Sequence, residues 1–227
     1  MSDSPSEPLP AAVPVFPLTG ALLLPRGLLP LNIFEPRYLD MVRDAMAATG
    51  AANRMIGMIQ PRPPRRGGID DADVPPLYDV GCLGRITDFR ETDDGRILIA
   101  LAGVCRFRVS AELERTKLYR QVVTDYHGLS DDRDPPGPLP ATLRADLEDG
   151  LRAYLDAQGL AADWDAVRSS DDESLIITLA SVCPFAPAER QALLEARDLT
   201  DRARTLSALM SFAQGPGDGD PERPTLQ

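Results

Sequence analysis

The spacing of apolar residues changes abruptly at a proline-rich segment, residues 128–140, which carries the letters GLSDDRDPPGPLP. Before this segment, apolar and polar residues alternate in short runs, as they do in half-buried strands. After it, apolar residues recur every three or four positions, as they do on one face of a helix. The change of period predicts a β domain followed by a helical domain, with the proline-rich segment as the linker between them.

Short strand candidates bounded by turn residues fill the part of the chain before the linker. Two of them flank Asp94-Gly95, a pair that is typical of a tight hairpin turn. The candidates are residues 13–18, 28–34, 54–60, 79–89, 96–103, 104–113 and 119–126. Several short strands at this spacing indicate a closed or nearly closed antiparallel barrel.

One helix is expected within the barrel. Pro36 suits a first helical position and Gly50 supplies a stop. The apolar residues between them follow helical spacing, at Tyr38, Met41, Val42, Ala45 and Met46. Residues 61–77 contain too much proline and glycine for a strand, so a long mobile loop is expected there.

Helical spacing after the linker predicts a small bundle. Its first helix ends near Gly159, a second is stopped by Pro184, a third starts after Pro187, and a fourth starts at Thr200. The expected fold class is therefore α+β, a β barrel with one inserted helix and then the bundle. The expected boundaries are a disordered tail at 1–10, the barrel domain at 11–127, the linker at 128–140, the bundle at 141–214 and a second disordered tail at 215–227.

The charge is distributed unevenly between the two halves. Up to His127 there are 15 Lys and Arg against 16 Asp and Glu, and from Gly128 onward there are 9 against 19. Phosphate binding relies on clustered cations, so a near-neutral half followed by a strongly acidic half argues against a general nucleic-acid binder.

The residues that commonly carry catalysis are scarce. Lys117 is the only lysine and has no glycine-rich turn beside it, so a phosphate-binding loop is excluded. A serine–lysine site would need the same lysine as its base, in a segment expected to be exposed. His127 is the only histidine, and a surface position at the end of a strand explains it better than a catalytic site does. We expect no enzyme activity.

No cofactor or metal is expected either. The three cysteines, Cys82, Cys105 and Cys183, lack the short spacing of zinc ligands, and burial as small apolar side chains explains them better. An odd number of widely spaced cysteines also argues against a disulfide framework. Together with the absence of a secretory signal or of a long apolar run, this favours a cytoplasmic protein without a membrane span.

Several of these segments resemble the Lon N-terminal domain, also called the Lon substrate-binding domain. The similarity covers roughly residues 11–214 and is greatest to small bacterial proteins that consist of this domain alone. The segments that carry it, in order, are VPVFPLTGALLLPRGLLPLNIFEPRY (13–38), RMIGMIQP (54–61), LYDVGCLGRITDF (77–89), DGRILIALAGVCRFRV (94–109) and CPFAPAERQALLEARDLTDRARTL (183–206). The resemblance implies a PUA-like pseudobarrel with a helix, followed by a helical subdomain. It also implies binding of unfolded or tagged polypeptides without the ATPase and peptidase modules of full-length Lon, which are not expected here.

A peptide-binding surface is expected near residues 31–38 and along a groove beside the bundle. Unfolded segments offer apolar side chains and unpaired backbone groups, so a receiving surface needs exposed apolar area and a few orienting charges. The candidate residues are Leu31, Ile33, Phe34 and Tyr38 as apolar anchors, Glu35 and Arg37 as polar contacts, and Arg106 and Arg108 as a positive stripe. For the anchors and the two charged residues, core packing, helix capping or a mutual ion pair remains an open interpretation. For Arg106 and Arg108, the alternative is a pair of solvated surface arginines.

Two other functions remain open at this point. PUA-like barrels include RNA readers, so RNA binding is the alternative, although aromatic residues for base stacking make up only 5% of the chain. The chain would also serve as an adaptor or regulator in protein quality control if it binds a protease or chaperone and delivers clients to it. The sequence does not specify the client or the oligomeric state.

Overall fold

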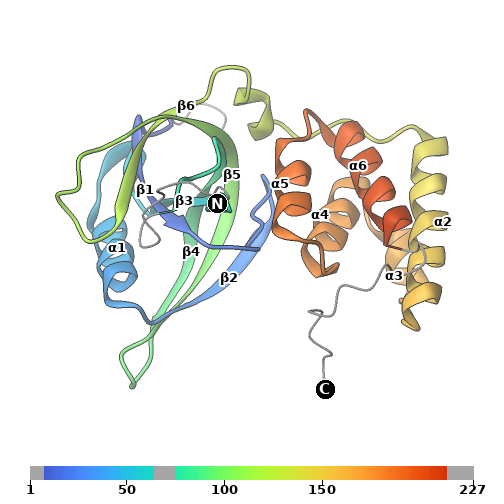
Figure 1. Ribbon diagram of the computed structural model, residues 1–227, viewed down its shortest axis with the longest axis horizontal. Helices are drawn as coiled ribbons and strands as arrows, with labels where there is room; N and C mark the ends of the chain where they lie inside the picture. Colours follow the sequence, from blue (N-terminus) through green and yellow to red (C-terminus); the bar gives the residue numbers. More distant parts are fainter. Residues whose placement is uncertain (1–7, 64–74, 214–227) are drawn as a thin grey trace. The chain divides into compact units, whose positions relative to one another are not determined.

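The computed structural model describes residues 8–63 and 75–213, which form two compact units (Figure 1). The first unit contains residues up to Pro136 together with Pro184–Glu195, and the second contains Gly137–Cys183 with the residues from Ala196 onward. Most of the two expected tails and the middle of the expected loop at 61–77 lie outside the described residues. Each unit is described by itself below.

The first unit is built around a six-stranded sheet that closes on itself (Figure 1). The strand order is β2-β5-β4-β3-β1-β6, and an additional pairing of β5 with β6 completes the barrel. The strands are β1 (Ala12–Pro17), β2 (Leu28–Ile33), β3 (Met55–Ile59), β4 (Val80–Glu91), β5 (Ile97–Glu112) and β6 (Arg120–Asp125). Helix α1 (Pro36–Ala47) is inserted between β2 and β3, with a short 3-10 turn η1 (Gly50–Ala52) after it. The predicted α+β class and the barrel with one inserted helix are confirmed, but β1 and β3 pair in parallel, so the barrel is not wholly antiparallel.

The longest strand, β5, belongs to two parts of the sheet. The sequence suggested two strands at 96–103 and 104–113, whereas the structure has one strand of 16 residues. On one side β5 pairs with β4 across the predicted hairpin. On the other side its first half pairs with β2 and its second half with β6. Only the second half therefore closes the barrel, and the first half forms an arm with β2 and β4.

Two glycines allow parts of the backbone to approach closely. A Cβ atom on Gly103 would lie 2.0 Å from the carbonyl oxygen of Leu24, where β5 passes from one partner strand to the next. A Cβ atom on Gly81 would lie 2.6 Å from the ring of Phe107, which is fully buried in the barrel core. These positions exclude any larger side chain unless the backbone moves.

Helix α5 (Pro187–Glu195) belongs to the first unit, although it lies within the helical region of the sequence. Gln60, buried after β3, donates from Nε2 to the carbonyl oxygen of Pro187 at 2.9 Å and to Oε1 of Gln191 at 3.3 Å. Gln191 is also buried and donates to the carbonyl oxygen of Val80 at 3.1 Å. These amides connect the helix to β3 and β4. The expected bundle at 141–214 therefore differs from the observed second unit by this helix.

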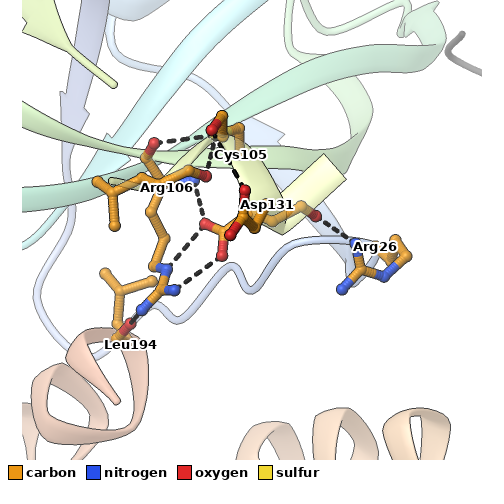
Figure 2. Close-up of polar contacts among 8 residues, drawn as sticks. Arg26, Cys105, Arg106, Asp131 and Leu194 are labelled. Atoms are coloured by element: carbon orange, nitrogen blue, oxygen red, sulfur yellow. Dashed lines mark hydrogen bonds and ion pairs between the residues drawn. The ribbon is translucent and has the colours of Figure 1, made fainter. Parts of the chain in front are cut away.

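A buried ion pair joins β5 to the segment that follows the barrel (Figure 2). The Arg106 guanidinium donates to both carboxylate oxygens of Asp132, at 2.8 and 2.7 Å, and to the carbonyl oxygen of Leu194 in α5 at 3.1 Å. Asp132 lies in the 3-10 turn η2 (Ser130–Arg133), within the segment predicted to be a linker, and its carbonyl oxygen accepts a hydrogen bond from Arg26. Burial by itself lowers the pKa of Arg106, but the hydrogen bonds and the charge of Asp132 outweigh it and raise that pKa above its ordinary value.

This ion pair places Arg106 inside the unit, since the residue is only 4% exposed. Arg106 therefore does not form an exposed positive stripe with Arg108. Sequence alternation could not reveal this, because the carboxylate that neutralises Arg106 is 26 positions further along the chain.

The second unit contains helices α2 (Ala141–Gln158), α3 (Trp164–Ser169), α4 (Asp172–Val182) and α6 (Leu199–Phe212). Their buried faces include Leu147, Leu151, Ile176, Leu206 and Met210. The predicted stop at Gly159 is confirmed, because this residue closes α2 in the left-handed conformation with φ 66°. The last helix is capped by the side chain of Asp198 rather than by Thr200, and α3 was not predicted.

We predict that Gly103→Ala lowers the free energy of unfolding by roughly 3 kcal/mol, because the added methyl group overlaps a backbone carbonyl that cannot rotate away. Gly137→Ala is the matched control, since a Cβ atom there meets nothing within 4 Å, and it should change the free energy by no more than about 0.5 kcal/mol. Urea unfolding followed by circular dichroism measures both values. Equal stability of the two variants would contradict the close approach.

We also predict that Arg106→Met destabilises the protein by about 3–5 kcal/mol, because it leaves the Asp132 carboxylate buried without its guanidinium. The double variant Arg106→Met, Asp132→Leu should recover most of this loss, since both buried charges are then gone. Arg168→Met, which removes an exposed ion pair with Asp165, should cost less than about 1 kcal/mol. A double variant no more stable than Arg106→Met in urea unfolding would show that the buried charge is not the cause.

Candidate functional site

Strand β2 is at the edge of the sheet and pairs only with β5 among the described residues. The carbonyl oxygen of Gly27 accepts a hydrogen bond from the N–H of Gly103 at 2.8 Å. Because backbone groups of successive residues in a strand point to opposite sides, Leu28, Pro30 and Asn32 direct theirs away from β5. Proline has no N–H, so the middle position offers only an acceptor. The open edge therefore has backbone donors at Leu28 and Asn32 and acceptors at all three residues.

The side chains of β2 also alternate between two environments. Leu28, Pro30, Asn32 and the following Phe34 are all exposed, whereas Ile33 is only 2% exposed. Leu28 is 65% exposed and Phe34 is 64% exposed, which is unusual for large apolar side chains. The exposed face of this edge strand therefore has an apolar residue at each end.

A shallow groove lies on the same face of the arm. The strand register places Pro30 opposite Ala100 and Asn32 opposite Leu98, and β4 continues both rows with Asp88 and Arg90. These residues, with Leu31 and Ile99, line a cavity of about 540 Å³. Its floor is largely apolar, and one acidic and one basic side chain lie at its β4 side. Such a surface suits an extended segment that carries apolar side chains.

Helix α1 starts three residues after β2 ends, at the corner that contains Glu35, Arg37 and Tyr38. Glu35 occupies the N-cap position but makes no side-chain cap, because its carboxylate binds the Arg37 guanidinium at 2.7 Å. The ring of Tyr38 is buried against Phe16, with 4.2 Å between the ring centroids, and the Arg37 guanidinium lies 4.9 Å from the centroid of the Tyr38 ring. The mutual ion pair and the packing role that the sequence left open are both present here.

A second cavity, of about 170 Å³, opens beside this corner. Three arginines and two tyrosines line it together with four apolar side chains. They are Arg37, Tyr38, Arg115, Tyr119, Arg120, Pro17, Pro61, Pro75 and Leu118. We refer to it as the arginine pocket.

The expected site residues therefore fall into three groups. Phe34, Glu35, Arg37 and Arg108 are exposed or partly exposed, and Leu31 lines the groove. Ile33 and Arg106 are buried in the interior and are not available at the surface. Tyr38 is buried but lines the arginine pocket.

Sequence reasoning overlooked other residues of these surfaces. Leu28 could have been found, because it shares the alternation of Pro30, Asn32 and Phe34. Arg115 and Arg120 could not, because they follow β5 in sequence and approach α1 only after the barrel closes.

Lys117 and His127, the two residues considered for catalysis, have different surroundings. Lys117 is exposed and pairs with Asp44 at 3.0 Å, and the Tyr119 hydroxyl donates to the same carboxylate at 2.7 Å. Both hydrogen bonds lower the pKa of Asp44, and the one from Tyr119 has the larger effect. His127 is exposed at the end of β6. Neither residue is placed beside a nucleophile by any contact in the described structure.

The cysteines are all buried. The Cys105 thiol donates to the carbonyl oxygen of Leu129 at 3.1 Å, and burial, followed by the charge of Asp132, raises its pKa to about 12. Such a thiol remains protonated at neutral pH. No three His, Cys, Asp or Glu side chains gather as a metal-binding group in the part of the chain that the structure describes. Within residues 8–63 and 75–213, no helix combines the length and the apolar content needed to cross a bilayer.

Comparison with known proteins gives consistent matches in sequence and structure. Lon protease 2 of Sorangium cellulosum is 27% identical over 226 residues, which cover 92% of this chain and 26% of that protein. Lon protease 2 of Myxococcus xanthus is 24% identical over 208 residues, covering 90% of this chain and 24% of that protein. The chain thus spans about a quarter of the length of these two bacterial relatives.

Two solved structures share the fold. A Lon N-terminal domain protein from Xanthomonas campestris is 25% identical with a TM-score of 0.59, and the match covers 87% of this chain and 97% of that one. The N-terminal domain of Lon protease from the Mycobacterium avium complex, at 19% identity, has a TM-score of 0.61 over 88% of this chain and 98% of that one. The family model described as the ATP-dependent protease La (LON) substrate-binding domain matches residues 12–211. Since this range includes most of the chain, the protein belongs to the Lon substrate-binding domain family.

Proposed function

We infer that the chain is a non-catalytic protein- and peptide-binding module that holds extended or unfolded polypeptide segments on the outer face of β2. The observation that carries this proposal is the pair of exposed apolar side chains, Leu28 and Phe34, on an edge strand with unpaired backbone groups. Membership of a substrate-binding family supports it, because the relatives are named as proteases and the substrates of proteases are polypeptides.

The chemistry of an unfolded segment matches this surface. Such a segment has unpaired N–H and C=O groups, which add as a further strand to an open edge. Its side chains project on alternate sides, so every second one would lie on the same face of the sheet as the groove that contains Pro30, Leu98 and Ala100. Backbone bonding would supply affinity without demanding a particular sequence, as a module with many clients requires.

The affinity of a single segment should be modest. Each buried apolar side chain contributes roughly 1–3 kcal/mol, and ordering a flexible segment offsets part of that gain. Pro30 also removes one donor from the edge, which shortens the hydrogen-bond ladder. Weak, reversible holding suits an adaptor or regulator in protein quality control that passes a client to a protease or chaperone.

We predict that replacing Leu28 and Phe34 together by Asp weakens binding of a reduced, carboxymethylated model polypeptide by at least about tenfold, because two apolar contacts become charged. The matched control replaces Leu160 and Val182, which are 57% and 69% exposed in the second unit, by Asp. It adds the same charge and should leave the affinity unchanged. Fluorescence anisotropy of the labelled polypeptide measures both.

Hydrogen exchange locates the contact independently. Slower exchange at the amides of Leu28 and Asn32 in the presence of the polypeptide is expected, because these donors face the open edge. An unchanged exchange rate across β2, together with equal losses of affinity in both double variants, would reject the proposed surface. Structured RNA should not displace the polypeptide, and displacement that weakens steeply with salt would favour RNA binding instead.

A further inference from the structure

The arginine pocket has features of a site for a small anion that is attached to an apolar group. We propose that it binds the C-terminal carboxylate of a bound polypeptide, with the side chain of the last residue against the apolar wall. This inference rests on the proposed polypeptide binding and specifies which part of a client is recognised there.

Tyr38 supplies the first argument. The residue is only 8% exposed, and its ring is fixed between Phe16 and the Arg37 guanidinium. Its hydroxyl nevertheless makes no hydrogen bond with any described residue, although Tyr38 lines the pocket. The hydroxyl is therefore available to a ligand oxygen in the pocket.

The start of helix α1 supplies the second argument. The helix has 12 residues, and the carboxylate of its N-cap Glu35 binds the Arg37 side chain and accepts no hydrogen bond from the backbone of the first turn. The carbonyl oxygen of Glu35 accepts from the N–H groups of Tyr38 and Leu39, whereas the N–H of Arg37 has no acceptor among the described residues. The first turn of a helix attracts anions through such donors and through its partial positive charge.

The side chains that line the pocket, taken together with their ion-pair partners, carry a net positive charge. Two of the three arginines are neutralised, since Arg37 binds Glu35 at 2.7 Å and Arg120 binds Glu112 at 2.5 Å. Arg115 is different, because its described contact with Glu112 is 3.9 Å long, at the limit of an ion pair. One guanidinium is therefore left for a ligand. In the adjoining surface cavity, the carboxylate of Asp44 is paired with Lys117 at 3.0 Å.

The size and the walls of the pocket define the ligand. A volume of about 170 Å³ is well below the roughly 300 Å³ at which sites for whole small molecules begin. It accommodates an end group, such as a carboxylate with one small apolar side chain. Pro17, Pro61 and Leu118 provide an apolar wall beside the arginines. A free phosphate would use the cations but leave this wall without a contact.

The test compares two short apolar peptides of identical sequence, labelled with fluorescein at the N-terminus. One ends in alanine with a free carboxylate and the other in alanine amide. The full chain should bind the acid more tightly than the amide, on the order of tenfold, because charge-assisted hydrogen bonds are lost in the amide. Inorganic phosphate should displace the acid only at concentrations far above the Kd of the peptide.

Two variants assign the preference to the pocket. Arg115→Gln and Tyr38→Phe should each reduce the affinity for the acid by several-fold while leaving that for the amide unchanged. Tyr38→Phe retains the ring that packs on Phe16, and unchanged amide binding shows that each variant is folded. Arg168→Gln, an exposed arginine of the second unit, is the control and should preserve the preference.

The outcomes separate this inference from the proposed function. Equal affinity for acid and amide in a protein that still binds unfolded polypeptide would overturn the carboxylate site and leave the binding module intact. Preference for the acid that persists in both pocket variants would also overturn it. Failure to bind either peptide or the unfolded polypeptide would reject the proposed function itself.

Discussion

The continuous pairing of β5 with three neighbours is the constraint on which the first unit depends. One strand of 16 residues runs beside β4 along one edge and beside β2 and then β6 along the other. The barrel closes only through the second half of β5, so its first half must extend beyond the closed part with β2 as its partner. An edge strand with one exposed face follows from this geometry. Gly103 allows β5 to pass from β2 to β6, because the carbonyl group of Leu24 occupies the place that a Cβ atom of residue 103 would take.

Buried polar side chains then fix segments that are distant in sequence. Arg106 joins β5, η2 and α5, and Gln60 and Gln191 join α5 to β3 and β4. Each of these groups would be costly if left without a partner, so they favour one arrangement of the segments over others that bury the same apolar area. In this way α5, which lies between α4 and α6 in the sequence, is held on the barrel.

The proposed binding surfaces lie outside the buried interior of the barrel. The interior of the barrel is buried, whereas the exposed arm and the arginine pocket lie at its margin and have unmatched backbone or side-chain groups. A surface that recognises backbone groups and a chain end does not depend on the internal sequence of its client. Recognition of this kind requires positioned donors and apolar area rather than a reactive group.

The sequence by itself determined the α+β class, most strands, helix α1 and the end of α2, because these features depend on local periodicity and on residues such as Pro36 and Gly159. It also offered Phe34, Glu35 and Arg37 as candidate surface contacts, and the structure shows that they are exposed or partly exposed. It could not show that Arg106 is neutralised by Asp132, that β1 pairs in parallel with β3, or that α5 belongs with the barrel. Nor could it bring Arg115 beside Tyr38. Those outcomes depend on which distant segments meet, and that is decided by barrel closure and by the pairing of buried charges and amides, which leave no periodic signal in the chain.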